Sequence, residues 1–118
     1  MKLIIAGSRS LDHIGLANAA VTRYLLEDKI SEIVSGGARG IDQVAIDYAC
    51  EQGYPSKVFP ADWDQYGRSA GYIRNVEMAT YADALLAIWD GHSKGTLHMI
   101  NAMHKQDKPV HVMEVYFK

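Results

Sequence analysis

Residues 32–53, EIVSGGARGIDQVAIDYACEQG, decide the fold of this chain, because they read as a strand, a glycine-rich loop and a helix in succession. The run 32–34 has β-type character, and the loop 35–42, SGGARGID, follows it with three glycines. Gly53 then ends the helix. Apolar residues recur at the spacing of one helix face: Ile41, Val44, Ala45, Tyr48 and Ala49. A structural turn rarely needs three glycines, so this loop is a candidate for a ligand that approaches the backbone.

The same alternation of strand and helix continues on both sides of this unit. Continuous apolar or β-rich runs predict strands at 3–6, 32–35, 57–59, 84–89 and from 109 onward. Helical periodicity predicts helices at 12–28, 41 to Gly53, about 71–81 and about 94–107, with Leu25 on the buried face of the first and Cys50 in the core. Parallel strands need right-handed crossover connections. The alternation therefore predicts an α/β, Rossmann-like, doubly wound parallel sheet of about five strands, in the order 3-2-1-4-5.

Composition limits the function classes. The 118 residues are 48% hydrophobic, which suits a single domain spanning 1–118 with a real core. A formal net charge of −2 argues against a protein that coats duplex DNA, so nucleic acid is not the expected partner. No apolar run approaches the roughly 20 residues that span a bilayer, and no membrane partner is expected. The single cysteine fits a reducing compartment, so we expect a cytoplasmic protein.

The unusual residues gather in the loops that follow the predicted strands. These loops are 7–9 (GSR), 35–42 (SGGARGID), 60–63 (PADW) and 89–96 (WDGHSKGT). The connections at the opposite edge, around 28–31, 53–55 and 107–109, are ordinary turns. Ligands of doubly wound sheets bind outside the carboxyl ends of the strands. This asymmetry predicts a binding site at the carboxyl edge.

Two of these loops have the composition of phosphate-binding loops. A helix N-terminus presents unpaired N–H groups and partial positive charge, and glycines let an anion reach them. The first loop supplies Gly36, Gly37 and Gly40 beside Arg39, and the second supplies glycines, Ser93 and Thr96 beside Lys94. Each loop could instead be a simple capped turn, with Ser93 as a good N-cap. The standard dinucleotide and P-loop fingerprints are absent.

The connection 61–75, ADWDQYGRSAGYIRN, places aromatic residues among arginines. Trp63, Tyr66 and Tyr72 could stack on a base, and Arg68 and Arg74 could bind a phosphate or a ribose-linked group. The alternative is a loop held on the domain by its own rings. No histidines are paired at metal-ligand spacing, so no metal site is expected.

These segments together, with AGYIRNVEM at 70–78 and ADALLAIWDGHSKGT at 82–96, resemble the YspA-related branch of the SLOG superfamily. That superfamily also contains DNA-processing protein A and the LOG-type phosphoribohydrolases, and the resemblance covers residues 3 to about 112. It implies a Rossmann-like domain that binds a nucleotide or an NAD- or ADP-ribose-like derivative at its carboxyl edge, for sensing or sequestration. It implies no cofactor, and the related families lead us to expect a homodimer through the helices at 71–81 and 94–107.

The residues expected to bind the ligand belong to the edge loops and to the arginine-containing helix. They are Gly7, Ser8, Arg9, Ser35, Gly36, Gly37, Ala38, Arg39, Gly40, Asp42, Asp62, Trp63, Arg74, Asn75, Asp90, Gly91, Ser93, Lys94, Gly95 and Thr96.

Catalysis is less expected than binding. The segment GHSKGT, 91–96, stands where LOG-type enzymes carry PGGxGTxxE, and Met99 occupies the position of the glutamate. A thioether cannot act as an acid or a base, which argues against LOG-type hydrolysis of an N-glycosidic bond. Two alternatives stay open: a hydrolase of an N-glycosidic or phosphoester bond that uses Asp42, Asp62 or Glu77 instead, and a module that binds single-stranded nucleic acid. A structural role for Asp42 at the start of its helix is at least as well supported.

Overall fold

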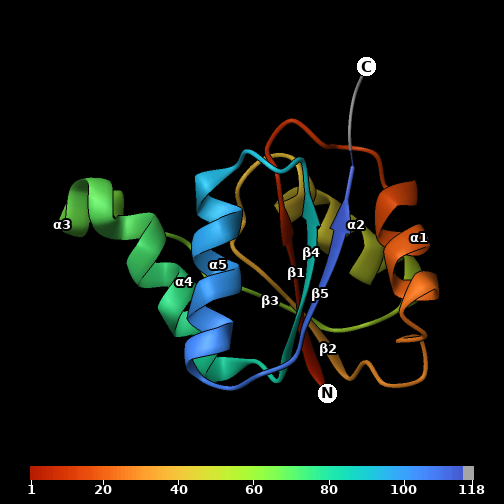
Figure 1. Cartoon of the computed structure of the whole chain (residues 1–118). Helices are drawn as coiled ribbons and strands as arrows, with labels where there is room; N and C mark the ends of the chain where they lie inside the picture. Colours follow the sequence, from red (N-terminus) through yellow and green to blue (C-terminus); the bar gives the residue numbers. More distant parts are fainter. Residues whose placement is uncertain (116–118) are drawn as a thin grey trace.

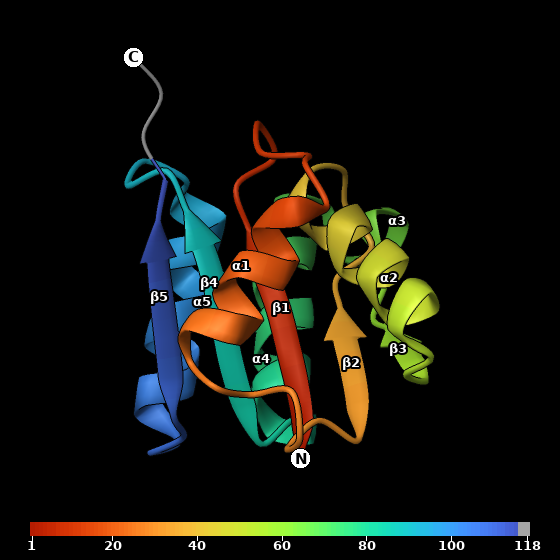
Figure 2. The same ribbon diagram turned by 90° about the vertical axis from the view of Figure 1, so that its right-hand side faces the viewer.

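Five parallel strands form one sheet in the computed structural model, which describes residues 1–115. They are β1 (Lys2–Gly7), β2 (Glu32–Ser35), β3 (Ser56–Val58), β4 (Ala84–Trp89) and β5 (Val110–Glu114). Their order is β3-β2-β1-β4-β5 (Figure 2), so the predicted order and fold class are confirmed. In the middle of the sheet Ile4 pairs with Val34 on one side and Leu85 on the other.

Helices cover both faces of the sheet (Figure 1). On one face lie α1 (Gly15–Arg23) and α2 (Ile41–Gln52), and on the other lie α4 (Ala70–Tyr81) and α5 (Lys94–Lys105). Successive side chains of a strand point to opposite faces, so a strand covered twice must be apolar throughout. In β1, Leu3 and Ile5 belong to the core beneath α1 and α2, while Ile4 and Ala6 belong to the core beneath α4 and α5.

The first helix is shorter than the pattern predicts, and one predicted core residue is exposed. Leu25 has a φ of 55° and is 73% exposed, so its predicted place in the core is wrong. The left-handed turn at Leu25 ends the helical path and directs the next residue, Leu26, into the core at 3% exposure. The predicted place of Cys50 in the core is wrong as well. Cys50 is exposed, because it lies outside the buried face of α2, which includes its neighbour Ala49.

The predicted irregular connection contains two short helices, α3 (Trp63–Tyr66) and the 3₁₀ helix η1 (Gly67–Ser69). Figure 1 shows α3 projecting away from the sheet at the start of α4. Asp62 caps α3 by accepting a hydrogen bond from Gln65 N at 3.1 Å. No residue of α3 or η1 is buried, and the Trp63 side chain is 53% exposed. This segment therefore adds surface next to the carboxyl edge and adds nothing to the core.

Candidate functional site

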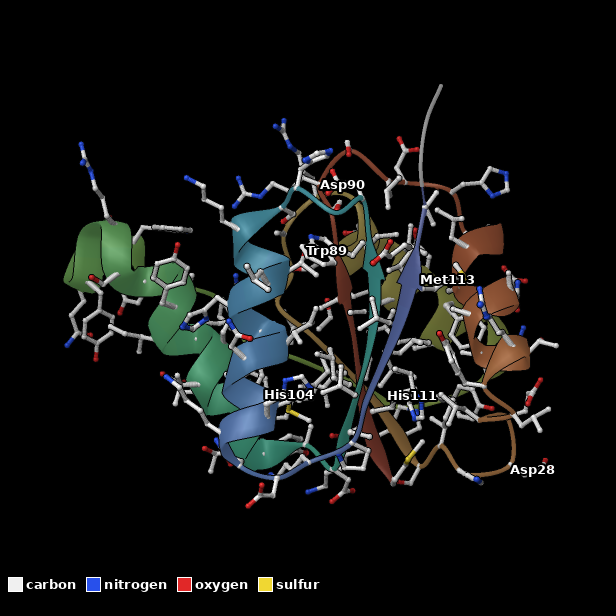
Figure 3. The ribbon with its side chains drawn as sticks, in the orientation of Figure 1. Asp28, Trp89, Asp90, His104, His111 and Met113 are labelled. Carbon is white, nitrogen blue, oxygen red and sulfur yellow. The ribbon has the colours of Figure 1, made fainter. Side chains whose placement is uncertain are left out.

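A cavity of about 450 Å³ opens at the carboxyl edge of the sheet, where the chain order reverses between β1 and β4. Figure 3 places Asp90 at this end of the molecule and Asp28 at the opposite end. The lining residues come from the loops after β1, β2 and β4 and from α4 and α5. They are Ala6, Gly7, Ser8, Arg9, Ser10, Ala38, Asp42, Arg74, Asn75, Met78, Asp90, His92, Ser93, Gly95, Thr96 and Met99.

A second cavity of about 420 Å³ adjoins the first. It lies between the glycine-rich loop and the segment that precedes α3, and its walls include the apolar side chains of Val58, Pro60 and Trp63. The two cavities share Arg9, Ala38 and Arg74. The remaining lining residues of the second cavity are Gly36, Gly37, Arg39 and Ala61. The two arginines therefore stand at the boundary between a polar chamber and a more apolar one.

Two glycines of SGGARGID, Gly36 and Gly40, are needed for the loop to pack in its observed conformation. A Cβ on Gly36 would lie 2.6 Å from Arg74 Nη1 and 2.9 Å from Asp42 Oδ2. Gly40 has a φ of +76°, and a Cβ there would lie 2.5 Å from the Cα of Arg9. These glycines let the loop pack against Arg9 and Arg74, so their bare backbone is needed even without a ligand.

Two N–H groups of the loop donate hydrogen bonds to side chains of the same loop. Gly37 N donates to Ser35 Oγ at 3.2 Å, and Ala38 N donates to Asp42 Oδ2 at 3.2 Å. Ser35 Oγ in turn donates to the backbone carbonyl of Asp42 at 2.8 Å. Groups used in this way are not available to a phosphate. These hydrogen bonds hold Ala38 beside the carboxyl group of Asp42.

Arg74 joins the site to two strand ends. Its Nη1 donates to Gly36 O at 2.6 Å and to Phe59 O at 3.5 Å, and its Nε donates to Asn75 Oδ1 at 3.1 Å. Burial lowers the pKa of Arg74, while the carboxylate of Asp42 acts in the opposite direction. An arginine pKa starts so high that the side chain keeps its charge at neutral pH. The site therefore contains a fixed, partly buried positive charge.

Asp42 lies in the wall of the first cavity at 8% exposure. Burial raises its pKa to about 6, and the hydrogen bond from Ala38 N and the charges of Arg74 and Arg9 only partly offset that effect. A carboxyl group with a pKa near 6 can gain or lose a proton close to neutral pH. This is the property that general acid–base chemistry requires.

The loop that leads into α5 is held by hydrogen bonds to the protein's own side chains. Asp90 Oδ1 accepts hydrogen bonds from His92 N at 2.8 Å and Ser93 N at 3.0 Å, and these bonds lower the pKa of Asp90. Ser93 caps the helix by accepting from Thr96 N at 3.4 Å and from Thr96 Oγ1 at 3.0 Å. The predicted phosphate cradle at this helix therefore already contains a carboxylate.

The apolar part of the first cavity's lining includes Met99. Met99 is 1% exposed and lines the cavity together with Gly95 and Thr96. Beside it, Asn75 Nδ2 donates to Gly95 O at 3.2 Å and lies 3.2 Å from His98 Nδ1. Asn75 thus joins α4 to the first turn of α5 and fixes the width of the cavity.

Most of the predicted residues line one of the two cavities, and a few do not. Gly91 and Lys94 line neither cavity, and Glu77 is exposed on α4 outside both. Ser35, Gly40 and Asp62 are supporting residues: Ser35 is buried beneath the loop, Gly40 forms its turn and Asp62 caps α3.

The residues expected to bind the ligand did not include several residues that line the cavities, namely Ala6, Ser10, Val58, Pro60, Ala61, Met78 and His92. Of these, Pro60, Ala61 and His92 belong to loops that were predicted at the carboxyl edge. Ser10 directly extends the predicted GSR loop and could have been included on that ground. The apolar lining residues could not be recognised from the sequence, because an apolar side chain at the end of a strand has the same pattern as a residue of the core.

Two features are absent from the described part of the chain. Among its helices, none has both the length and the apolar character that crossing a bilayer requires. Within residues 1–115, no group of three His, Cys, Asp or Glu side chains comes together as a metal ion would need.

Comparison with known proteins identifies relatives of the chain. The model of the YspA, cpYpsA-related SLOG family matches residues 1–66. The Gene 61 protein of Mycobacterium phage D29 is 38% identical over 84 residues, which are 66% of this chain and 67% of that protein. Among solved structures, DNA processing protein A (DprA) from Streptococcus pneumoniae superposes with a TM-score of 0.75 and 18% sequence identity. That match covers 98% of this chain but only 51% of the DprA chain, so it establishes the fold alone.

Proposed function

Because the chain belongs to the YspA, cpYpsA-related SLOG family, we propose that it binds a nucleotide or a nucleotide-derived small molecule at the carboxyl edge of its sheet. The observation that carries this proposal is the pair of adjoining cavities with Arg9 and Arg74 at their shared boundary. Their volumes, about 450 and 420 Å³, fall within the range of small-molecule sites.

The distribution of side chains supports the same class of ligand. Arginines bind phosphate through several charge-assisted hydrogen bonds. The Arg9 side chain is exposed, and within residues 1–115 no hydrogen bond is formed by its guanidinium. Trp63 offers an accessible ring that could stack on a base, because it is half exposed and borders the second cavity.

The direct test is native mass spectrometry of the purified protein, followed by titration calorimetry with nucleoside monophosphates, NAD and ADP-ribose. We expect a stoichiometric complex with one of these ligands and its recovery unchanged. Absence of binding by all of them, together with a protein free of any co-purifying nucleotide, would contradict the proposal.

Hydrolysis of an N-glycosidic or phosphoester bond is the second candidate function, and Asp42 is the observation that favours it. Its carboxyl group lines the first cavity with a pKa of about 6 and could transfer a proton to a leaving group. Glu77 is less suited, because it is exposed and outside both cavities. Chromatography of the incubated ligands separates the two functions: release of base or ribose phosphate that is lost in Asp42→Asn would establish hydrolysis.

We also propose that the chain forms a homodimer through α4 and α5. Tyr72 and Val76 on α4 are 47% and 48% exposed, and Leu97 on α5 is 42% exposed. The same two helices pack side by side (Figure 1). Light scattering at micromolar concentration should give the mass of a dimer, and Val76→Asp should shift it toward the monomer. A wild-type monomer would contradict this proposal without affecting the binding site.

A further inference from the structure

We propose that His98 is a positioning residue for the site: its neutral imidazole holds the Asn75 amide in the orientation that Arg74 requires, and a proton on His98 releases that arrangement. This inference concerns the control of the site and not the class of its ligand. It rests on the proposed function only in giving Arg74 a ligand to bind.

The Asn75 amide lies between three partners and is 6% exposed. Its Oδ1 accepts a hydrogen bond from Arg74 Nε at 3.1 Å. Its Nδ2 donates to Gly95 O at 3.2 Å and lies 3.2 Å from His98 Nδ1. This one side chain therefore connects the arginine on α4 with two residues in the first turns of α5.

Two of these partners determine which way the amide faces. A guanidinium only donates hydrogen bonds, and a carbonyl oxygen only accepts them. The Oδ1 of Asn75 must therefore face Arg74, and its NH₂ group must face Gly95 O. The second N–H of the same NH₂ group is then the one that faces His98 Nδ1.

The orientation of the amide determines the state of His98. A nitrogen that faces an N–H group must accept, so Nδ1 carries no proton and the neutral ring has its proton on Nε2. Protonation of the ring places a second N–H at Nδ1, opposite the NH₂ group of Asn75. A turned amide would offer Oδ1 to the charged ring, but its NH₂ group would then face Arg74 Nε and its oxygen would face Gly95 O.

The surroundings of His98 set the pH range of this effect. The ionisable side chains around it are Tyr72 on α4, whose ring centroid lies 4.3 Å away, and Lys94 and Lys105 on α5, with Arg74 beyond the amide. Burial lowers the pKa of His98, and the positive charge of Lys105 lowers it further. The ring is therefore neutral at pH 8 and takes up a proton only in the acidic range.

The consequence for the site passes through Arg74. This side chain lines both cavities, and together with Arg9 and Arg39 it supplies the positive charge of the second one. Without the bond from its Nε, its guanidinium is held only by the carbonyls of Gly36 and Phe59. A proton on His98 should therefore weaken the binding of an anion at Arg74.

NMR of the nitrogen-labelled, ligand-free protein tests the inference directly. At pH 8 the His98 ring should carry its proton on Nε2, and the Arg74 Nε–H signal should shift as the pH falls to 5. In His98→Asn, an amide oxygen can accept from Asn75 but does not titrate, so the shift of the Arg74 signal should be smaller by the part that follows His98. A proton on Nδ1 at pH 8, or an equal shift in both proteins, would overturn the inference.

The comparison with His98→Asn also removes the effect of Asp42, which titrates with a pKa of about 6 in both proteins. His104→Asn is the matched control, because His104 is exposed at the other end of α5 (Figure 3) and should leave the Arg74 signal unchanged. If His98→Asn fails to fold, the titration of Asp42→Asn decides. The shift should persist there with the midpoint of the His98 ring signals, and its disappearance would overturn the inference.

Calorimetry with AMP measures the effect on binding. The wild type and His98→Asn should bind AMP within about twofold of each other at pH 8, and the wild type should bind at least about threefold more weakly than the variant at pH 5. A ratio that does not change with pH would overturn the control of binding by His98. Failure of AMP, NAD and ADP-ribose to bind would contradict the proposed function, and the NMR titration would still decide the role of His98.

Discussion

Arg74 Nη1 lies 2.6 Å from the backbone carbonyl oxygen of Gly36 and donates a hydrogen bond to it across the carboxyl edge of the sheet. The contact joins α4 to the loop after β2, and it occupies the space that a side chain at position 36 would need. The glycine-rich loop and the arginine helix, which are separate motifs in the sequence, therefore form one unit in the structure.

The first prediction follows from this contact. Gly36→Ala should lower the free energy of unfolding by about 1–3 kcal/mol, because the added Cβ would displace the Arg74 guanidinium. Gly95→Ala is the matched control, since a Cβ there meets no atom within 4 Å. Its stability should be unchanged or higher by up to about 1 kcal/mol, as an alanine favours the helix. Urea unfolding measures both, and equal stabilities of the two variants would contradict the packing argument.

The second prediction concerns which cations bind the ligand. Arg9→Ala should lower nucleotide affinity by about 1.5–3 kcal/mol, the range of a charge-assisted hydrogen bond. Lys94→Ala should have little effect, because Lys94 lines neither cavity and the N–H groups of His92 and Ser93 just before α5 already donate to Asp90. Arg23→Ala, on the exposed surface of α1, is the control for a general loss of charge. Calorimetry that found Lys94→Ala as damaging as Arg9→Ala would favour a phosphate at the helix terminus instead.

The third prediction is a pH dependence caused by Asp42. Its pKa is about 6 in the folded protein, against 3.8 for the unperturbed group. Between pH 3.8 and about 6 the folded state keeps a proton that the unfolded state has lost, so this group makes the free energy of unfolding fall as pH rises. By pH 8 the contribution amounts to about 3 kcal/mol, and it is absent from Asp42→Asn.

Urea unfolding of both proteins at pH 4, 6 and 8 measures this effect. The stability of Asp42→Asn relative to the wild type should increase across that range. A constant difference between the two proteins would mean that Asp42 titrates as an ordinary exposed carboxyl group.

The fourth prediction concerns the end of α4. Lys108 Nζ donates to the backbone carbonyls of Ala79 and Ala82, both at 2.7 Å, and of Thr80 at 3.1 Å. A cation at a helix C-terminus satisfies carbonyls that have no partner within the helix and interacts favourably with the helix dipole. Lys108→Met should therefore lower the midpoint of thermal unfolding, by an amount that corresponds to about 1–2 kcal/mol. Lys29→Met, at an exposed position, should leave it unchanged.

The sequence determined the architecture of this protein, because strands that are buried on both faces of a parallel sheet appear in the sequence as continuous apolar runs. The apolar runs at 3–6 and 84–89 and the helical spacing at 41–49 indicated alternating strands and helices, and the strand order expected of a doubly wound sheet of this kind is confirmed. The gathering of the unusual loops at one edge was also predictable, since the loops that follow parallel strands must lie at their carboxyl ends. Met99 lines the same cavity as Gly95 and Thr96 for a reason that the sequence also contains: residues three and four apart share a helix face.

Only the tertiary structure decided what each polar residue in those loops does. Whether an N–H group is free depends on which side chain reaches it, and Asp90 and Asp42 reach groups that the loop composition assigned to a phosphate. Gly36 was predicted to lack a side chain so that a ligand could approach its backbone. In the structure the group against it is the guanidinium of Arg74, which lies 38 positions further along the chain. Such contacts depend on distances between segments far apart in sequence, which a local pattern does not encode. The same is true of the raised pKa of Asp42, because burial is a property of the folded molecule and not of the residue.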